Sequence, residues 1–351
     1  MTLPENHPLN DGRTTDAPLI RAYRGERQAT PPVWFMRQAG RSLPEYRELR
    51  VGNAMLDACL TPELSSEITL QPVRRHGVDA AIFFSDIVIP IKLAGVEVEI
   101  VPGRGPVLAD PIRSVSDVAK LRPLDPAALA PIIEGVARTV AELGSTPLIG
   151  FAGAPFTLAS YLVEGGPSKD QLRARTMMYT EPHAWATLLN WCADVSGAFL
   201  QAQVLAGASA AQLFDSWVGS LSEQQYVRRV APHSKRALSH LRGLDIPKVH
   251  FGVGSGEVLA AMHGIGADVM GVDWRIPLDE ANRRLGGTVP LQGNLDPALL
   301  GAPAHILEAH VVDVIDRGRV APAHVLNLGH GVPPDTDPDV LTRIVEQVHA
   351  G

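Results

Sequence analysis

Residues 147–161 read PLIGFAGAPFTLASY, a short apolar run that ends in glycine, alanine and proline and leads on to Tyr161. The first five residues are almost continuously apolar, which is typical of a strand buried on both faces of a parallel sheet. Seven other short runs share this character, so the chain offers eight candidate strands. The seven are Val33–Met36, Ala80–Phe84, Ala210–Phe214, Lys248–Phe251, Asp268–Gly271, Val289–Leu291 and Val325–Leu328.

Longer segments with helical periodicity lie between most of these runs, and one more follows the last run. They are Pro62–Arg75, Pro126–Leu143, Trp185–Leu205, Pro232–Leu241, Leu278–Leu285, Ala304–Ile315 and Val340–Val348. Eight strand and helix units predict an α/β fold, namely a single-domain (β/α)8 TIM barrel. The low aromatic content of 5% agrees, because branched aliphatic side chains fill most barrel interiors. A doubly wound open sheet is the alternative that the pattern leaves open.

The charge balance limits the ligands that the chain is expected to bind. Its 351 residues include 31 Lys and Arg against 38 Asp and Glu, which gives a net charge of −7. General binding to nucleic acid or to an anionic membrane needs a basic surplus or stripe, so we expect neither partner. An acidic ligand must therefore meet a local basic site.

The two cysteines, Cys59 and Cys192, are far apart and form no CxxC pair, which predicts a reducing, cytoplasmic setting without disulfides. Residues 1–17 have neither a basic start nor an apolar stretch, so we expect a mobile N-terminal tail before a catalytic barrel domain at 18–351. The most apolar region, Val78–Val101, is interrupted by charged residues and proline and cannot span a bilayer.

Polar and glycine-rich segments follow each predicted strand, where barrel enzymes assemble their sites. We expect them to converge on one mouth. They are Arg37–Arg41, Ser85–Asp86, Gly153–Thr157 leading to Tyr161, Asp215–Trp217, Gly252–Gly256, Asp273, Gln292–Asn294, and Asn327 with Gly329–Gly331.

Arg37 and Arg41 are two guanidinium groups in the loop directly after the first strand, separated by Gly40, which lets the backbone turn. Two such forks are suited to clamping carboxylates or phosphates. The structural alternative is a pair of salt bridges to Glu45 and Glu48. Because the protein is acidic overall, two arginines in a loop directly after a strand indicate ligand binding rather than salt bridges.

Asp86 lies in the apolar stretch FFSDIVIP at 83–90, where an unpaired carboxylate is costly. A capping acid for the next helix, or a partner for an arginine, is its structural alternative. His330 stands between Gly329 and Gly331 at the mouth, where it could bind an acidic group or move a proton; a hydrogen bond that only shapes the turn is the alternative.

Two further signals are weak. Residues 252–256 read GVGSG, but the last glycine of a GxGxxG motif would fall on Glu257. We therefore expect a tight turn, whose amides could meet an anion, rather than a nucleotide site. The 12 histidines include no HExxH motif, and no histidine joins a cysteine at ligand spacing, so we expect no metal.

Four stretches together resemble the uroporphyrinogen decarboxylase family, and the resemblance runs from about Pro18 to the C-terminus. They are PVWFMRQAGRSLPEY at 32–46, GFAGAPFT at 150–157 with Tyr161, FDSW at 214–217 and NLGHGV at 327–332. Asp337 departs from the family pattern, where proline is expected, and the N-terminal tail has no counterpart. Neither departure touches the expected chemistry.

The resemblance implies a (β/α)8 homodimer of the haem pathway. Such an enzyme removes carbon dioxide from the four acetates of uroporphyrinogen III and gives coproporphyrinogen III, with neither cofactor nor metal. It also implies the site: Asp86 stabilises the transition state and Arg37 and Tyr161 assist catalysis. The residues expected to bind the substrate are Arg37, Gln38, Ala39, Gly40, Arg41, Asp86, Tyr161, Ser216 and His330.

The residue types agree with that chemistry. Loss of carbon dioxide from an acetate leaves an electron pair that needs an acceptor, which is usually a cofactor. A pyrrole ring protonated at carbon can itself be the acceptor, and a buried carboxylate such as Asp86 would stabilise the resulting positive charge. A guanidinium is a poor general acid, so the proton donor stays unassigned.

Three alternatives come from other classes. The barrel methyltransferases that activate thiols need a zinc site of His and Cys, which this chain lacks. A non-catalytic tetrapyrrole carrier could share Arg37 and Arg41 but has no need of Asp86 in an apolar pocket. An open-sheet nucleotide enzyme would bind immobilised dinucleotide.

Overall fold

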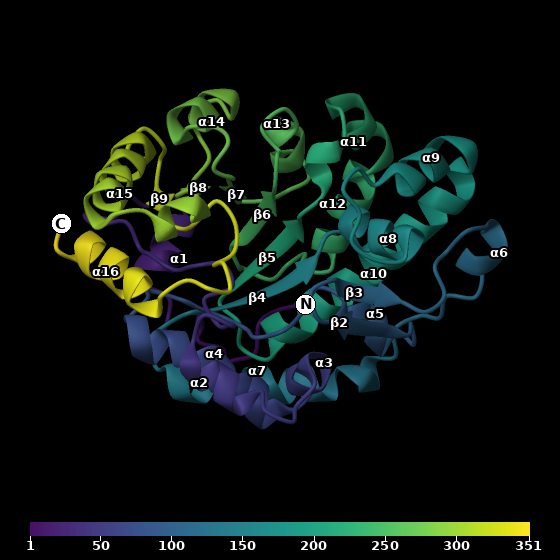
Figure 1. Ribbon diagram of the computed structural model, residues 1–351, viewed down its shortest axis with the longest axis horizontal. Coiled ribbons are helices and arrows are strands. Elements are labelled where there is room, and N and C mark those ends of the chain that lie inside the picture. Colours follow the sequence, from purple (N-terminus) through teal and green to yellow (C-terminus); the bar gives the residue numbers. More distant parts are fainter.

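The computed structural model describes residues 1–351, and a parallel sheet forms its centre. Neighbouring strands are hydrogen-bonded in the order β1-β4-β5-β6-β7-β8-β9, and every pair is parallel. Figure 1 shows the strands curling in the middle of the molecule with helices around them. The strands are β1 (Ala81–Ile82), β4 (Leu148–Gly153), β5 (Ala210–Asp215), β6 (Lys248–Gly252), β7 (Val269–Gly271), β8 (Leu291–Gln292) and β9 (His324–Val325).

The segment around Val33 closes the gap between β9 and β1. Trp34 N donates to Leu326 O at 3.3 Å, and Leu326 N donates to Pro32 O at 2.8 Å. On the other side, Asp79 N donates to Val33 O at 2.8 Å, while Val33 N donates to the Asp79 carboxylate at 2.7 Å. The barrel prediction is confirmed, but the expected first strand, Val33–Met36, is reduced to one bridge from Val33 to Leu326. Its ladder is short because the side chains of Asp79, Gln38 and Asn327 take the N–H groups of residues 33, 35 and 36.

Helices cover the outside of the barrel. The seven expected helical segments correspond to α4, α7, α10, α12, α14, α15 and α16, while the sequence analysis missed most of the short helices. None of the helices has the length and apolarity needed to cross a bilayer. The α-helices are α1 (Pro18–Tyr23), α2 (Pro44–Leu49), α3 (Met55–Cys59), α4 (Pro62–His76), α5 (Ile89–Leu93), α6 (Val115–Val118), α7 (Ala130–Leu143), α8 (Pro155–Glu164), α9 (Leu172–Thr180), α10 (Pro182–Leu205), α11 (Glu223–Arg229), α12 (Ala231–Ser239), α13 (Leu259–His263), α14 (Leu278–Arg284), α15 (Ala304–Gly318) and α16 (Pro338–His349). The short 3-10 helices are η1 (Pro126–Leu129), η2 (Val218–Ser220) and η3 (Pro297–Gly301).

A polar network crosses the inside of the barrel, where we expected aliphatic layers. Gln292 Nε2 on β8 donates to Gln212 Oε1 on β5 at 3.2 Å, and these strands are not neighbours in the sheet. The Tyr23 hydroxyl donates to Gln292 Oε1, and Trp34 Nε1 donates to Tyr23 at 3.2 Å. All four side chains are buried, and their hydrogen bonds to one another offset the cost of burying polar groups.

Residues 1–17, which we expected to form a mobile tail, have contacts with the barrel. His7 and Thr14 are both 2% exposed. The His7 ring nitrogen Nε2 lies 3.0 Å from Val204 O, and the Thr14 hydroxyl lies 2.8 Å from that of Ser209, just before β5. Leu9 joins the one large cluster of buried apolar residues that continues to Val348. The segment therefore packs at the end of the barrel opposite the mouth.

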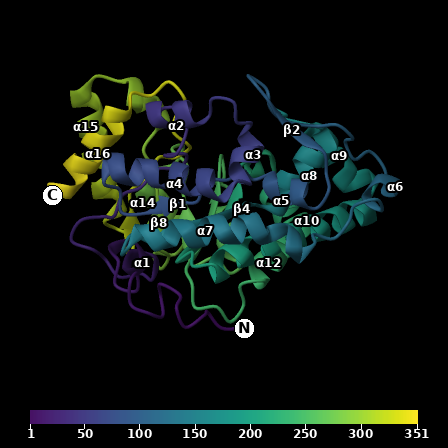
Figure 2. The same ribbon diagram turned by 90° about the horizontal axis from the view of Figure 1, so that it is seen from below.

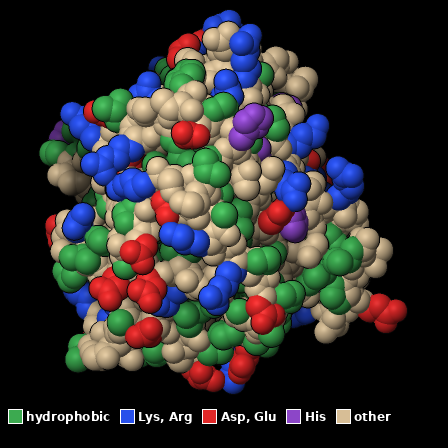
Figure 3. Space-filling model, turned by 90° about the vertical axis from the view of Figure 1, so that its right-hand side faces the viewer, with side chains coloured by type: hydrophobic (Ala, Val, Ile, Leu, Met, Phe, Trp, Pro, Cys, Tyr) green, Lys and Arg blue, Asp and Glu red, His purple; other side chains and the backbone are tan.

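Two short strands that were not predicted from the sequence form an antiparallel hairpin, β2 (Val98–Val101) with β3 (Gly105–Leu108). In Figure 2 the hairpin lies at the upper edge of the molecule, and the N-terminus lies at the opposite side. Acidic, basic and hydrophobic side chains are interspersed on the face shown in Figure 3, without a continuous basic area.

Candidate active site

The loop that carries Arg37 is held in an unusual conformation. Arg37 has a φ of 60°, in the left-handed region that residues with a side chain rarely adopt. Its stem packs against Gly331, where an added Cβ would lie 2.4 Å from Arg37 Cδ. Asn327 Oδ1 accepts a hydrogen bond from Met36 N at 3.0 Å, and Val332 N donates to Met36 O at 2.9 Å. The loops after the first and last strands therefore position Arg37 together.

Arg37 and Arg41 are both exposed and form no ion pair. The alternative of salt bridges to Glu45 and Glu48 fails, because Glu45 instead pairs with Arg75 at 2.7 and 2.8 Å. The amides of residues 39–41 donate to no acceptor within the protein. Two free guanidinium groups beside free amides form a site for an anion.

Asp86 combines a structural bond with a free oxygen. Its Oδ1 accepts a hydrogen bond from Val88 N at 3.0 Å in the turn before α5. The N-cap residue of α5 is Val88 and no side chain caps this helix, so the alternative of a capping acid is wrong, although the bond holds the turn. Its Oδ2 has no hydrogen-bond partner in the protein and is not fully buried. Burial raises the pKa of this carboxyl, while the Val88 amide and Arg37 act in the opposite direction. One oxygen is therefore held and the other is available to a ligand.

Tyr161, on α8, lies near both Asp86 and Arg37. Burial and the charge of Asp86 raise the pKa of its hydroxyl to about 12, and Arg37 lowers it. At neutral pH this hydroxyl keeps its proton and can donate a hydrogen bond. Its ring stacks on Trp217 with the centroids 4.1 Å apart.

The buried carboxylate of Asp215 helps to position Trp217 through Thr157. The hydroxyl of Thr157, at the start of α8, donates to Asp215 Oδ1 at 2.8 Å and accepts from Trp217 N at 3.4 Å. Thr157 and Asp215 are both fully buried. Ser216, between Asp215 and Trp217, is half-buried and forms no hydrogen bond within the protein. Its hydroxyl is free to donate to a ligand.

His330 is half-buried at the mouth. Its ring meets that of Trp274 edge to face, with the centroids 6.3 Å apart. Burial, Arg37 and Arg275 lower the pKa of His330 to about 4, although Asp273 has the opposite effect. The imidazole is therefore neutral at pH 7 in the unliganded site. An approaching carboxylate would raise its pKa and strengthen the bond.

Gln38 does not point its side chain into the mouth, contrary to our expectation of a substrate contact. The side chain is fully buried; its Oε1 accepts from Phe35 N at 3.0 Å and its Nε2 donates to Ala80 O at 3.0 Å. It joins the Arg37 loop to β1. The neighbouring Ala39 and Gly40 are half-buried and present their amides.

Thr157 and Trp217 lie in segments that we expected at the mouth but were not predicted as site residues, and Arg275 was not predicted there at all. All three lie close to the residues just described. Arg275 also follows a predicted strand, and that signal could have identified it. Residues 252–256 form a turn after β6, where Gly254 N donates to the Asp273 carboxylate at 2.6 Å. This amide is already bound, so the turn does not offer it to an anion as the sequence suggested.

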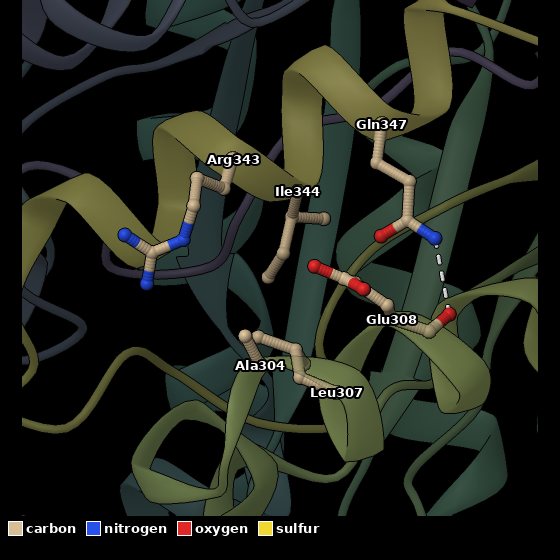
Figure 4. Close-up of a pocket in the computed structure, with 6 residues that line it drawn as sticks. All are labelled: Ala304, Leu307, Glu308, Arg343, Ile344 and Gln347. Carbon is tan, nitrogen blue, oxygen red and sulfur yellow. Dashed lines mark hydrogen bonds between the residues drawn. The ribbon is translucent and has the colours of Figure 1, made fainter.

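A groove of about 180 Å³ lies between α15 and α16, away from the mouth (Figure 4). It is lined by Leu307, Glu308 and Arg343, and Gln347 Nε2 donates to Glu308 O beside it at 3.0 Å. It is on the outer wall of the barrel. Nowhere do three or more His, Cys, Asp or Glu side chains come together in a way that could hold a metal ion.

The family model described as "Uroporphyrinogen decarboxylase (URO-D)" matches residues 14–351. The chain belongs to this family. It is 68% identical to the uroporphyrinogen decarboxylase of Arthrobacter sp. (strain FB24), with 97% of this chain and 99% of that protein aligned. It is 64% identical to the uroporphyrinogen decarboxylase of Leifsonia xyli subsp. xyli (strain CTCB07), with 99% and 98% aligned.

A solved methyltransferase from Methanosarcina mazei has a similar fold, with a TM-score of 0.80, 19% identity and 96% of this chain and 98% of that one covered. At this identity the likeness concerns the fold alone. It agrees with a barrel and not with the doubly wound open sheet, the alternative that the sequence pattern left open.

Proposed function

We propose that the mouth of the barrel binds uroporphyrinogen III through the residues described above and uses Asp86 to remove carbon dioxide from its four acetates, giving coproporphyrinogen III. Membership of the family makes the chain a carboxy-lyase that decarboxylates uroporphyrinogen in tetrapyrrole biosynthesis. The observation that carries the assignment of residues is the free oxygen of Asp86, on a desolvated carboxylate that interacts electrostatically with Arg37.

The reaction needs positive charge to be tolerated on a pyrrole ring. A proton added to a ring carbon gives an iminium-like cation, and the bond between the acetate CH₂ and its carboxyl group then breaks. The electron pair of that bond moves into the ring and neutralises the cation. A proton taken up by the exocyclic carbon completes the methyl group, and the ring carbon gives its proton back.

Asp86 Oδ2 is suited to stabilise this cation through the pyrrole N–H groups. At about 4 Å and an effective dielectric constant of about 20, the attraction is roughly 4 kcal/mol, or about a thousandfold in rate if it develops in the transition state. Burial opposes ionisation of Asp86 in the empty site, and a cationic ring reverses that effect. The ionised form of Asp86, and with it the attraction to the ring, is therefore most favoured when the cation forms.

The other residues hold the periphery of the macrocycle. Arg37 and Arg41, with the amides of Ala39 and Gly40, bind substrate carboxylates, and neutral His330 donates one further hydrogen bond. Tyr161 and Ser216 donate hydrogen bonds near the reacting acetate. This arrangement explains how a protein with a net charge of −7 binds a substrate with eight carboxylates, because Arg37 and Arg41, which form no ion pair, lie in one loop at the mouth.

We also propose that the chain acts as a homodimer in the cytoplasm, without a metal or an organic cofactor. The resemblance to the family supports the dimer. Cys59 and Cys192 are buried and free, which suits a reducing compartment.

Anaerobic incubation with uroporphyrinogen III in the presence of a chelator, followed by chromatography of the oxidised products, tests the activity. We expect the four-carboxylate product without any added cofactor. Loss of activity on chelation and recovery with zinc would overturn the metal-free mechanism. Tight binding without turnover would favour the tetrapyrrole carrier.

A further inference from the structure

The loop after β9 is packed between two arginine-bearing segments. On one side, a Cβ added to Gly331 would lie 2.4 Å from Arg37 Cδ; on the other, a Cβ added to Gly329 would lie 2.3 Å from Trp274 N. His330 stands between these two glycines. The segment Asp273–Arg275, which follows β7, therefore forms the wall of the mouth on the far side of His330 from Arg37.

The Arg275 guanidinium is fixed by two contacts. Its Cζ lies 4.0 Å from the centroid of the Trp274 ring, and its Nη1 donates to Asp273 Oδ2. Asp273 is 1% exposed and accepts a further bond from Gly254 N at 2.6 Å, so it is itself immobile. An arginine held in this way loses little side-chain entropy when a ligand binds.

Most of the hydrogen-bonding capacity of Arg275 is unused. A guanidinium has five N–H donors, and one of them is bound to Asp273; no protein group accepts from the others. The side chain is 49% exposed, so these donors are accessible. If Arg275 served only to neutralise Asp273, its other donors would have no role; their exposure at the mouth makes them available to a ligand.

The position of Arg275 separates it from the reacting group. β7 is four strand positions around the barrel from β1 when the Val33 bridge is counted as the eighth strand, and Asp86 follows β1. Arg275 therefore lies across the mouth from Asp86. A carboxylate bound there belongs to a part of the macrocycle that is not reacting in that step.

We propose that Arg275 and His330 form a carboxylate-binding subsite that takes one non-reacting peripheral carboxylate of the substrate. This inference rests on the proposed function and adds a residue to it. Because Arg275 binds a group remote from the bond that breaks, it contributes equally to the bound substrate and to the transition state. Its loss should raise KM and leave kcat nearly unchanged.

The test compares Arg275→Gln with Arg283→Gln. Arg283 lies on α14, is 73% exposed and pairs with Glu280, so its replacement makes the same change of charge away from the mouth. For Arg275→Gln we expect KM for uroporphyrinogen III to rise about tenfold, with kcat within about twofold of wild type. For Arg283→Gln we expect wild-type KM. The KM of the wild type should also rise more steeply with salt than that of Arg275→Gln.

A second variant guards against loss of folding. Arg275→Gln leaves the buried carboxylate of Asp273 without its partner, whereas Arg275→Lys keeps the positive charge but not the planar fork. We expect Arg275→Lys to fold and to raise KM about threefold. If both variants fold, a wild-type KM in both would overturn the subsite. If only Arg275→Lys folds, a wild-type KM in that variant would do so. Either result would leave the proposed function intact. A wild-type protein that does not decarboxylate uroporphyrinogen would instead overturn the proposed function.

Discussion

Replacement of Asp86 by Asn separates the two roles that the structure gives this side chain. Oδ1 accepts the Val88 amide at 3.0 Å, and an Asn oxygen can accept the same bond. The free Oδ2 becomes an NH₂ group that would face the pyrrole N–H groups. The substitution therefore keeps the bond to Val88 N in the turn before α5 and removes only the charge.

The expected effect on the rate follows from the charge. If the carboxylate contributes roughly 4 kcal/mol to a cationic transition state at about 4 Å, its loss lowers kcat by at least about a hundredfold, allowing for partial compensation by the amide. Stability should hold or rise. Burial raises the folded pKa of Asp86, so the ionised group costs stability above its unfolded pKa, and Asn relieves that cost.

Turnover of uroporphyrinogen III and the thermal midpoint should be measured on the same preparation. Asp86→Ala provides the matched comparison, because it removes the charge and the bond to Val88 together and should be less stable than Asp86→Asn by about 0.5–2 kcal/mol. Near-normal turnover with a lower melting temperature in Asp86→Asn would refute the catalytic role and leave only a structural role in the turn before α5.

Three further predictions test the surroundings of Asp86. Arg37→Ala and Arg41→Ala should fold normally, because neither arginine is ion-paired, and should lower kcat/KM roughly ten- to hundredfold; wild-type kinetics in either would remove it from the site. Thr157→Val should be less stable to urea than Thr157→Ser by about 1–3 kcal/mol, because valine leaves Asp215 without its donor; equal midpoints would show that this bond carries no weight. The folded pKa of His330, about 4, lies below its unfolded value of about 6.5, so its contribution to stability is complete above pH 6.5 and is lost as the pH falls towards 4. His330→Gln should flatten the acid limb of the stability curve, and an NMR titration midpoint near 6.5 would contradict the assignment.

The order of short apolar runs and helical segments determined the barrel, because strands buried on both faces need apolar residues at every position. The positions after those runs also determined which side chains reach the mouth, since parallel strands end on one side. Arg37, Arg41, Asp86, Tyr161 and His330 could be predicted in this way. The hydrophobic pattern along each element indicates which of its faces is buried, and that pattern is a local property of the sequence.

Packing alone decided the hydrogen-bond partner of each polar side chain. Gln38 is one residue from Arg37, yet both ends of its side chain are used by Phe35 and Ala80, because the loop turns it inward. Nothing in the local sequence distinguishes these two neighbours. Likewise, His7 and Thr14 are buried because Val204 and Ser209, nearly 200 positions away, lie at the same end of the barrel.

The interior network and the Arg275 wall have the same origin. Gln212 and Gln292 read as isolated polar residues in apolar strands, and only closure of the barrel brings their side chains within 3.2 Å of each other. Arg275 reads as one more surface charge until β7 and β9 place it beside His330. The sequence alone predicted most strands of the barrel and its longer helices, and the end of the barrel at which the polar segments gather. Hydrogen-bond partners distant along the chain required the tertiary structure, because such bonds depend on distances that only packing sets.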